Sequence, residues 1–130
     1  MLLPTTLTTC AAAAVIAMWL VMRVGRLRIQ FKISHGDGGN EALMRRMRAQ
    51  LNYVENAPFV LLLVAVIELS GKGGLWLSYV AAIFLLARVA HAIGMDSVAP
   101  SRLRMIGVLV TMLTLLGLAV VAVLIAWGVL

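Results

Sequence analysis

Residues 45–58 read RRMRAQLNYVENAP and lead directly into an apolar segment. On an α-helix each residue turns by ~100°, so Arg48, Asn52 and Glu55 fall within roughly a quarter-turn of one another. Arg45 shares this face. The stretch therefore predicts a polar stripe on a helix that enters lipid. A charged side chain at bilayer depth is costly unless it is paired or faces a cavity, so the stripe is a candidate functional site.

The rest of the chain has the composition of a membrane protein. It is 63% hydrophobic and 12% charged, which excludes a soluble domain. Each apolar stretch reaches the ~20 residues that cross a hydrocarbon core, the second only if its helix includes the polar stripe. No alternating period suggests a barrel, so the spans are predicted to be helices. The predicted spans of this single 130-residue domain are approximately 3–25, 41–69, 75–94 and 102–129.

The basic residues predict the topology. Of the eleven lysines and arginines, all except Lys72 lie in the first and third predicted loops or in the helix ends that flank them. Basic loops stay in the cytoplasm, so both termini are expected outside it. The first apolar run precedes its basic residues, which is the wrong order for a cleaved signal peptide. We therefore expect a multi-pass protein of a bacterial inner membrane, and no nucleic-acid partner.

Two residues are predicted to cap helices. Asn40, followed by the acidic Glu41, is suited to begin the second helix after the glycine-rich turn at 34–40. Ser101 is suited to begin the fourth helix. Because the connections are short, consecutive helices are expected to pack antiparallel, as an up-down four-helix bundle. The predicted fold class is thus an all-α integral membrane bundle.

Other polar residues gather at the cytoplasmic ends of the predicted helices, where they would lie at one membrane depth. They are Arg26, Arg28, Arg88, His91, Arg102 and Arg104. Several have a simpler interpretation. Arg26, Arg28 and Arg102 can reach anionic headgroups, the stripe can form an internal ion pair, and His91 can form an interhelical hydrogen bond. Arg46 and Lys32 are predicted to face solvent or headgroups, and Glu68 to be structural.

The polar residues together predict the kind of ligand. Arginines bind carboxylates with two parallel hydrogen bonds, while a carboxylate such as Glu55 accepts from an ammonium group. A tripeptide thiol with two carboxylates and one amine fits this set. A further arginine beside the sulfur would favour the thiolate, which is the nucleophilic form.

The pattern RAQxNxxExxP at 48–58 resembles the second-helix signature of the MAPEG family, the membrane-associated proteins of eicosanoid and glutathione metabolism. The other three helices carry similar motifs in the family's order. These are Arg26-Leu27-Arg28, Arg88-Val89-Ala90-His91, and Arg104 with Gly107 and Thr111. The Gly36-Asp37-Gly38-Gly39 loop is similar to that of the bacterial branch.

The resemblance implies a homotrimer of four-helix subunits that binds glutathione between neighbours, near the cytoplasmic face. The implied contacts with glutathione are Arg26, Arg48, Asn52, Glu55 and His91. Arg104 is the implied thiolate-stabilising residue, and Arg102 competes with it for this role or is a further contact. One residue departs from the family pattern: Met95 stands where family enzymes commonly carry a tyrosine.

These observations predict a glutathione-dependent membrane enzyme of the transferase or peroxidase type, acting in detoxification. Its substrate would be a hydrophobic electrophile or lipid hydroperoxide delivered by the membrane lipids. The protein would position the thiolate and stabilise it electrostatically, without a metal.

Two other functions are considered. Met95 is compatible with a non-catalytic membrane scaffold, or with a trimer that only binds lipid or glutathione. A small multidrug-type transporter also has four short helices, and Glu55 would be its exchangeable acid. The arginines near Glu55 would repel cationic substrates, which argues against the transporter.

Overall fold

A computed structural model describes residues 2–130, which form four α-helices and no strand. The helices are α1 (Pro4–Phe31), α2 (Glu41–Leu69), α3 (Leu75–Gly94) and α4 (Arg102–Ala126). Each is long and apolar enough to cross a membrane. The predicted all-α, four-span membrane fold is therefore confirmed.

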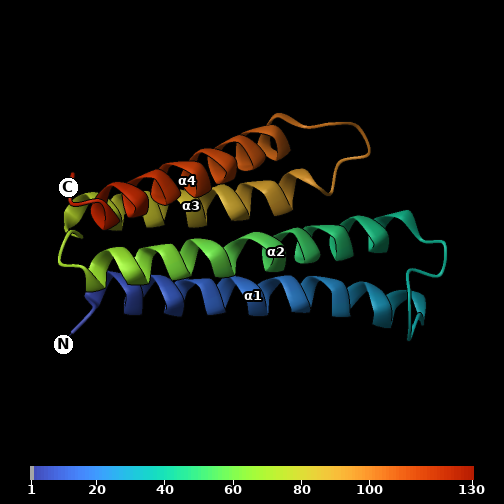
Figure 1. Ribbon diagram of the computed structural model, residues 1–130. Helices are drawn as coiled ribbons and strands as arrows, with labels where there is room; N and C mark the ends of the chain where they lie inside the picture. The colour runs from blue at the N-terminus through green and yellow to red at the C-terminus, as the bar shows by residue number, and fades with distance from the viewer. Residues whose placement is uncertain (1) are drawn as a thin grey trace.

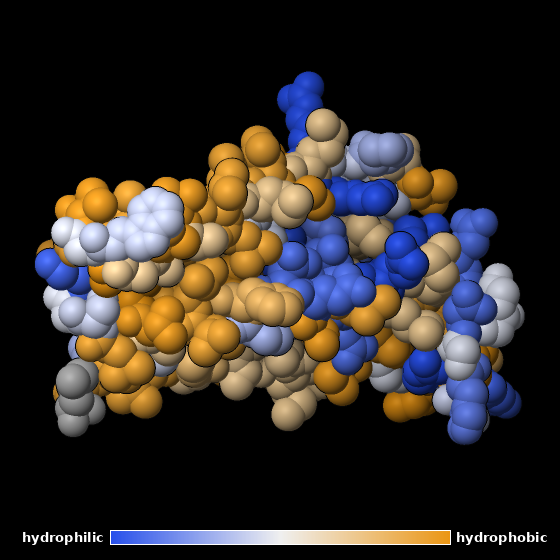
Figure 2. Space-filling model, viewed as in Figure 1, coloured by the Kyte–Doolittle hydropathy of each residue, from blue (hydrophilic) through white to orange (hydrophobic). Residues whose placement is uncertain are grey.

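The helices run up and down in sequence order (Figure 1). α1 packs against α2, α3 packs against α4, and α2 also contacts α3 and α4. Both termini lie at the same end of the bundle as the α2–α3 turn, and the other two loops lie at the opposite end (Figure 1). On the face shown in Figure 2, hydrophobic surface predominates over the half of the bundle with the termini, whereas hydrophilic surface gathers towards the two loops.

The predicted helix starts at Asn40 and Ser101 are confirmed. The Asn40 side chain accepts a hydrogen bond from the backbone N–H of Leu43 at 2.9 Å. The hydroxyl of Ser101 accepts one from the backbone N–H of Arg104 at 3.2 Å. Each cap satisfies a donor that the first helical turn leaves unpaired. The first helix differs from the predicted span: it continues past residue 25 and ends at Phe31.

Polar contacts tie α1 to α2 at two levels. At the start of α1, where no side chain of its own caps the helix, the Glu68 carboxylate accepts from the backbone N–H groups of Thr5 and Thr6. A carboxylate at a helix N-terminus also interacts favourably with the helix dipole. Halfway along, the buried Tyr53 hydroxyl donates to the carbonyl of Ala13 at 2.6 Å. Glu68 therefore has the structural contact expected for it.

Candidate functional site

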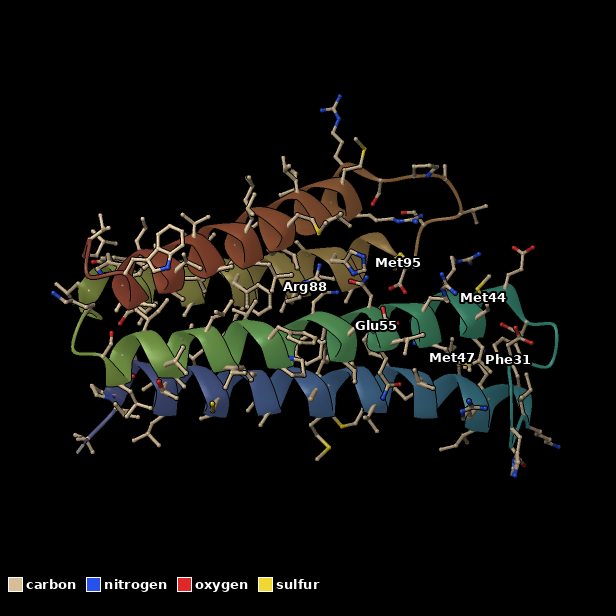
Figure 3. All side chains as sticks on the ribbon, viewed as in Figure 1. Phe31, Met44, Met47, Glu55, Arg88 and Met95 are labelled. Atoms are coloured by element: carbon tan, nitrogen blue, oxygen red, sulfur yellow. The ribbon has the colours of Figure 1, made fainter. Side chains whose placement is uncertain are left out.

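A polar cavity of about 190 Å³ lies between α2, α3 and α4, towards the end that carries the two longer loops. It is lined by Arg48, Leu51, Asn52, Glu55, His91, Met95, Arg104 and Val108. Figure 3 shows Glu55 on α2 facing the α3 segment that bears Met95 and Arg88. Five of the seven residues predicted to form the site line this one cavity.

Helical spacing explains why these side chains meet. Arg48, Asn52 and Glu55 recur at intervals of four and three along α2, so they share the face that points to the cavity. His91 and Met95 are one turn apart at the end of α3. The spacing of the polar residues along each helix determines which of them share a face. The packing of the helices then brings these polar faces of α2, α3 and α4 together around the cavity.

A glycine brings α4 close enough to complete the cavity. A Cβ atom at Gly107 would lie 2.5 Å from the Cβ of His91 and 2.7 Å from the carbonyl oxygen of Ala87. Only a residue without a side chain permits this close approach of two helices in a membrane. Arg104, one turn before Gly107, consequently reaches the same cavity as His91.

Arg88 lies behind the cavity wall and is 1% exposed. One of its terminal nitrogens donates to the side-chain oxygen of Asn52 at 2.6 Å, and the other donates to the carbonyl of Gly107 at 3.1 Å. The guanidinium thus joins α2, α3 and α4 at the level of the cavity. The position of Arg88 in the sequence predicts this depth but not its contacts with Asn52 and Gly107.

Two predicted site residues lie outside this cavity. Arg26 is exposed on α1, and Arg102 is exposed at the first position of α4. Arg102 and Arg104 are about 200° apart on the helix, so both cannot face the same cavity. Within one subunit, the cavity therefore contains Arg104 and not Arg102.

A second polar cluster, which the sequence analysis missed, supports the end of α3. The buried Arg23 on α1 donates to the carbonyl of Ala92 at 3.0 Å and forms an ion pair with Asp96. Its guanidinium also lies over the ring of Trp19, 4.8 Å from the ring centre. Arg46 donates to the backbone carbonyl of Arg23 at 3.0 Å and lies 3.4 Å from Asp96.

The prediction that Arg46 faces only solvent or headgroups was therefore wrong. A buried guanidinium is costly unless it is paired, and the Asp96 carboxylate contacts both the buried Arg23 and the partly buried Arg46. The only sequence signal was Asp96, the sole acidic residue of the third loop. The cluster matters for the cavity because Asp96 directly follows Met95, a cavity residue.

Larger hollows on the described bundle are more apolar and more open. The largest, about 710 Å³ along α1 and α2, includes Arg28 and Arg48 but is lined mainly by apolar side chains. A groove of about 440 Å³ between α3 and α4, towards the end with the termini, is lined almost entirely by apolar side chains such as Trp76 and Leu118. In a bilayer, lipid tails can fill such a surface without specific chemistry. The polar cavity is thus the candidate site.

Fold and cavity together define a four-span membrane protein with an arginine-rich site at one end of its helices. The chain belongs to the MAPEG family, whose model matches residues 6–124. This confirms the resemblance found in the sequence. The family includes glutathione transferases and peroxidases.

Two relatives come from Escherichia coli. The inner membrane protein YecN of strain K12 is 35% identical over 89 residues, which cover 65% of this chain and 67% of the relative. YecN of strain O6:H1 matches with the same identity and coverage. No solved structure matches the chain. Membership of the family and four apolar helices establish a multi-pass membrane protein.

Proposed function

We propose that this protein is a glutathione-dependent membrane enzyme of the transferase or peroxidase type, acting on hydrophobic electrophiles or lipid hydroperoxides. One observation carries the proposal. The cavity gathers two arginines, an asparagine, a histidine and one carboxylate from three different helices. A site with this balance of charges suits a ligand with several acidic groups and a single ammonium.

The ammonium, the sulfur and one of the two carboxylates of glutathione each have a complementary residue in the cavity. Arg48 and Asn52 can bind a carboxylate, and Glu55 can accept from the ammonium. Arg104, opposite on α4, would lie beside the sulfur. A guanidinium stays protonated and attracts a thiolate much more strongly than a thiol, so it would increase the ionised fraction.

The chemistry would then follow from the thiolate. In a transferase reaction its sulfur forms a bond to the electrophilic carbon, and the displaced electron pair leaves with the leaving group. In a peroxidase reaction the thiolate attacks the terminal peroxide oxygen, and the O–O bond breaks to give glutathione sulfenic acid and an alkoxide, which takes up a proton to become the alcohol. A second glutathione thiol then displaces the hydroxyl group from the sulfenic sulfur, giving the disulfide and water. The protein contributes positioning and electrostatic stabilisation, without a covalent intermediate of its own.

A homotrimer is part of the proposal. Arg48 and Glu55 line the cavity but remain exposed on a single subunit, at a depth where lipid contact is costly. A neighbouring copy would cover them and complete the site. Arg26, which lies outside its own subunit's cavity, is the residue we expect to extend into the neighbour's site.

The orientation is proposed on the distribution of charge. We infer an inner-membrane location with both termini outside the cytoplasm. All lysines and arginines except Lys72 lie in or beside the two loops at the opposite end of the bundle, and basic loops stay in the cytoplasm. The cavity would then lie near the cytoplasmic face, where glutathione is available.

Glutathione binding to detergent-purified protein tests the proposal. We expect saturable binding by calorimetry, weakened by at least about tenfold in Arg48→Ala and in Glu55→Gln, since each removes a charge-assisted hydrogen bond. Arg45→Ala is the matched control, because Arg45 is on the same helix but pairs with Glu41 outside the cavity. Equal affinity in all four proteins would refute the site.

A second candidate is a trimer that binds glutathione without turning it over. Met95 favours it, because this apolar side chain lines the cavity where family enzymes commonly carry a tyrosine. Conjugation of a model electrophile by protein that binds glutathione distinguishes the two. Binding without turnover would support the non-catalytic candidate.

A further inference from the structure

Arg88 is the most deeply buried charged residue among those described, yet it does not line the cavity. Its contacts are to Asn52 on α2, at 2.6 Å, and to the backbone of Gly107 on α4, at 3.1 Å. Such a charge within a membrane helix is retained only when its partners are well placed. The question is what the contact with Asn52 does for the site.

The chemistry of arginine determines which way the Asn52 amide faces. A guanidinium has five N–H donors and no acceptor, so only the oxygen of the Asn52 amide can face Arg88. The NH₂ group must then point to the opposite side. Asn52 lines the cavity in front of Arg88, so that side is the cavity. A free asparagine could present either group, whereas this one can present only a donor.

We propose that Arg88 is a positioning residue that fixes the Asn52 amide with its NH₂ group facing the cavity, making this wall selective for a carboxylate. The inference rests on the proposed function, since the carboxylate is expected to be one of glutathione's. With Asn52 held in this way, the wall of α2 presents donors from Arg48 and Asn52, and Glu55 is its only charged acceptor. The ligand's ammonium is thereby directed to Glu55 and its carboxylate to the other end.

A purely structural role for Arg88 makes different predictions. The same guanidinium joins three helices through Asn52 and Gly107, so its removal would loosen the bundle whatever the amide does. The test must therefore separate the direction of the amide from the strength of the helix contact. Asn52→Asp does this, because a carboxylate still accepts from Arg88 but presents an acceptor to the cavity.

The experiment compares Asn52→Asp, Asn52→Ala and Arg88→Met in the full-length, detergent-purified protein. Thermal unfolding reports the helix contact, and calorimetry with glutathione reports the site. We expect Asn52→Asp to unfold at or above the temperature of the parent and to bind glutathione at least about tenfold more weakly. Asn52→Ala should unfold at a lower temperature, because it removes one of the two acceptors of the buried Arg88. Undiminished glutathione binding by Asn52→Asp would overturn the proposal.

The double variant Arg88→Met/Asn52→Ala shows whether Arg88 acts through Asn52. If it does, adding Arg88→Met to Asn52→Ala should weaken binding by no more than about twofold. If the losses of glutathione affinity caused by Arg88→Met and by Asn52→Ala simply add, Arg88 acts through helix packing, and the positioning role is overturned. Should Arg88→Met fail to fold, the unfolding temperatures of Asn52→Asp and Asn52→Ala decide, because equal values would show that Arg88 does not hold the side chain at this position.

Failure of the proposed function gives a different result from failure of this inference. If the parent does not bind glutathione, the proposed function fails, and the unfolding temperatures still test the contact. Equal unfolding temperatures for Asn52→Asp and Asn52→Ala would then show that Arg88 does not hold the amide.

Discussion

Replacing Gly107 by alanine should separate the two helices that complete the cavity. A Cβ atom there would lie 2.5 Å from the Cβ of His91, so α3 and α4 would have to move apart by almost 1 Å to restore an ordinary contact of about 3.4 Å. The nearest atoms include the backbone carbonyl of Ala87 at 2.7 Å, which no side-chain rotation can move away. The same shift would lengthen the hydrogen bond from Arg88 to the carbonyl of Gly107.

The expected magnitude is a difference between two effects. Overpacking of this kind costs about 1–3 kcal/mol, and alanine recovers up to about 1 kcal/mol over glycine in a helix. Because the clashing atoms include backbone, the cost is at the upper end of this range, and we expect Gly107→Ala to lower the free energy of unfolding by about 2 kcal/mol. Glutathione binding should weaken as well, because His91 and Arg104 lie on the two helices that separate.

Gly117→Ala is the matched control. Gly117 is in the same helix, and a Cβ atom there would have no neighbour within 4 Å. This variant should be as stable as the parent, or slightly more stable, in the same detergent unfolding assay. If Gly107→Ala were equally stable, the close α3–α4 contact would be refuted as the feature that builds the cavity.

Three further predictions concern the supports of the bundle and its orientation. Asp96→Ala should destabilise the protein by about 1 kcal/mol, because it leaves the buried Arg23 without its counter-charge; this value is reduced for the partial exposure of Asp96. An unchanged chemical denaturation midpoint would contradict the ion pair. Glu68→Gln should lower the unfolding temperature more than Glu41→Gln does, since Glu68 alone of the two caps α1. Reporter fusions after Leu130 should be active only outside the cytoplasm, and cytoplasmic activity would reverse the orientation.

The parts of the fold predicted well from the sequence are those set by local patterns. Span lengths, the caps at Asn40 and Ser101, and the shared face of Arg48, Asn52 and Glu55 depend only on residues within a few turns. The extension of α1 beyond its apolar segment was missed, because hydropathy marks where a chain meets lipid and not where its helix ends.

The contacts that position the site could not be predicted in this way. Arg23 and Asp96 are 73 residues apart, and Arg88 and Asn52 are 36 apart, so only the packing of helices shows that they meet. Local sequence also did not distinguish Arg102 from Arg104, since both open the fourth helix. The approach of α4 through Gly107 places Arg104 at the cavity, whereas Arg102 lies on the other side of the helix, outside the cavity lining.

The most direct test of the central claim is the ultraviolet absorbance of the glutathione thiolate during titration of the purified protein near neutral pH. A free thiol has a pKa of about 8.5, so only a few per cent is ionised without the site. We predict a saturable thiolate signal in the parent and in Arg102→Ala, and its loss in Arg104→Ala with binding largely kept. Saturable binding without a thiolate signal in the parent, or an unchanged signal in Arg104→Ala, would contradict the account.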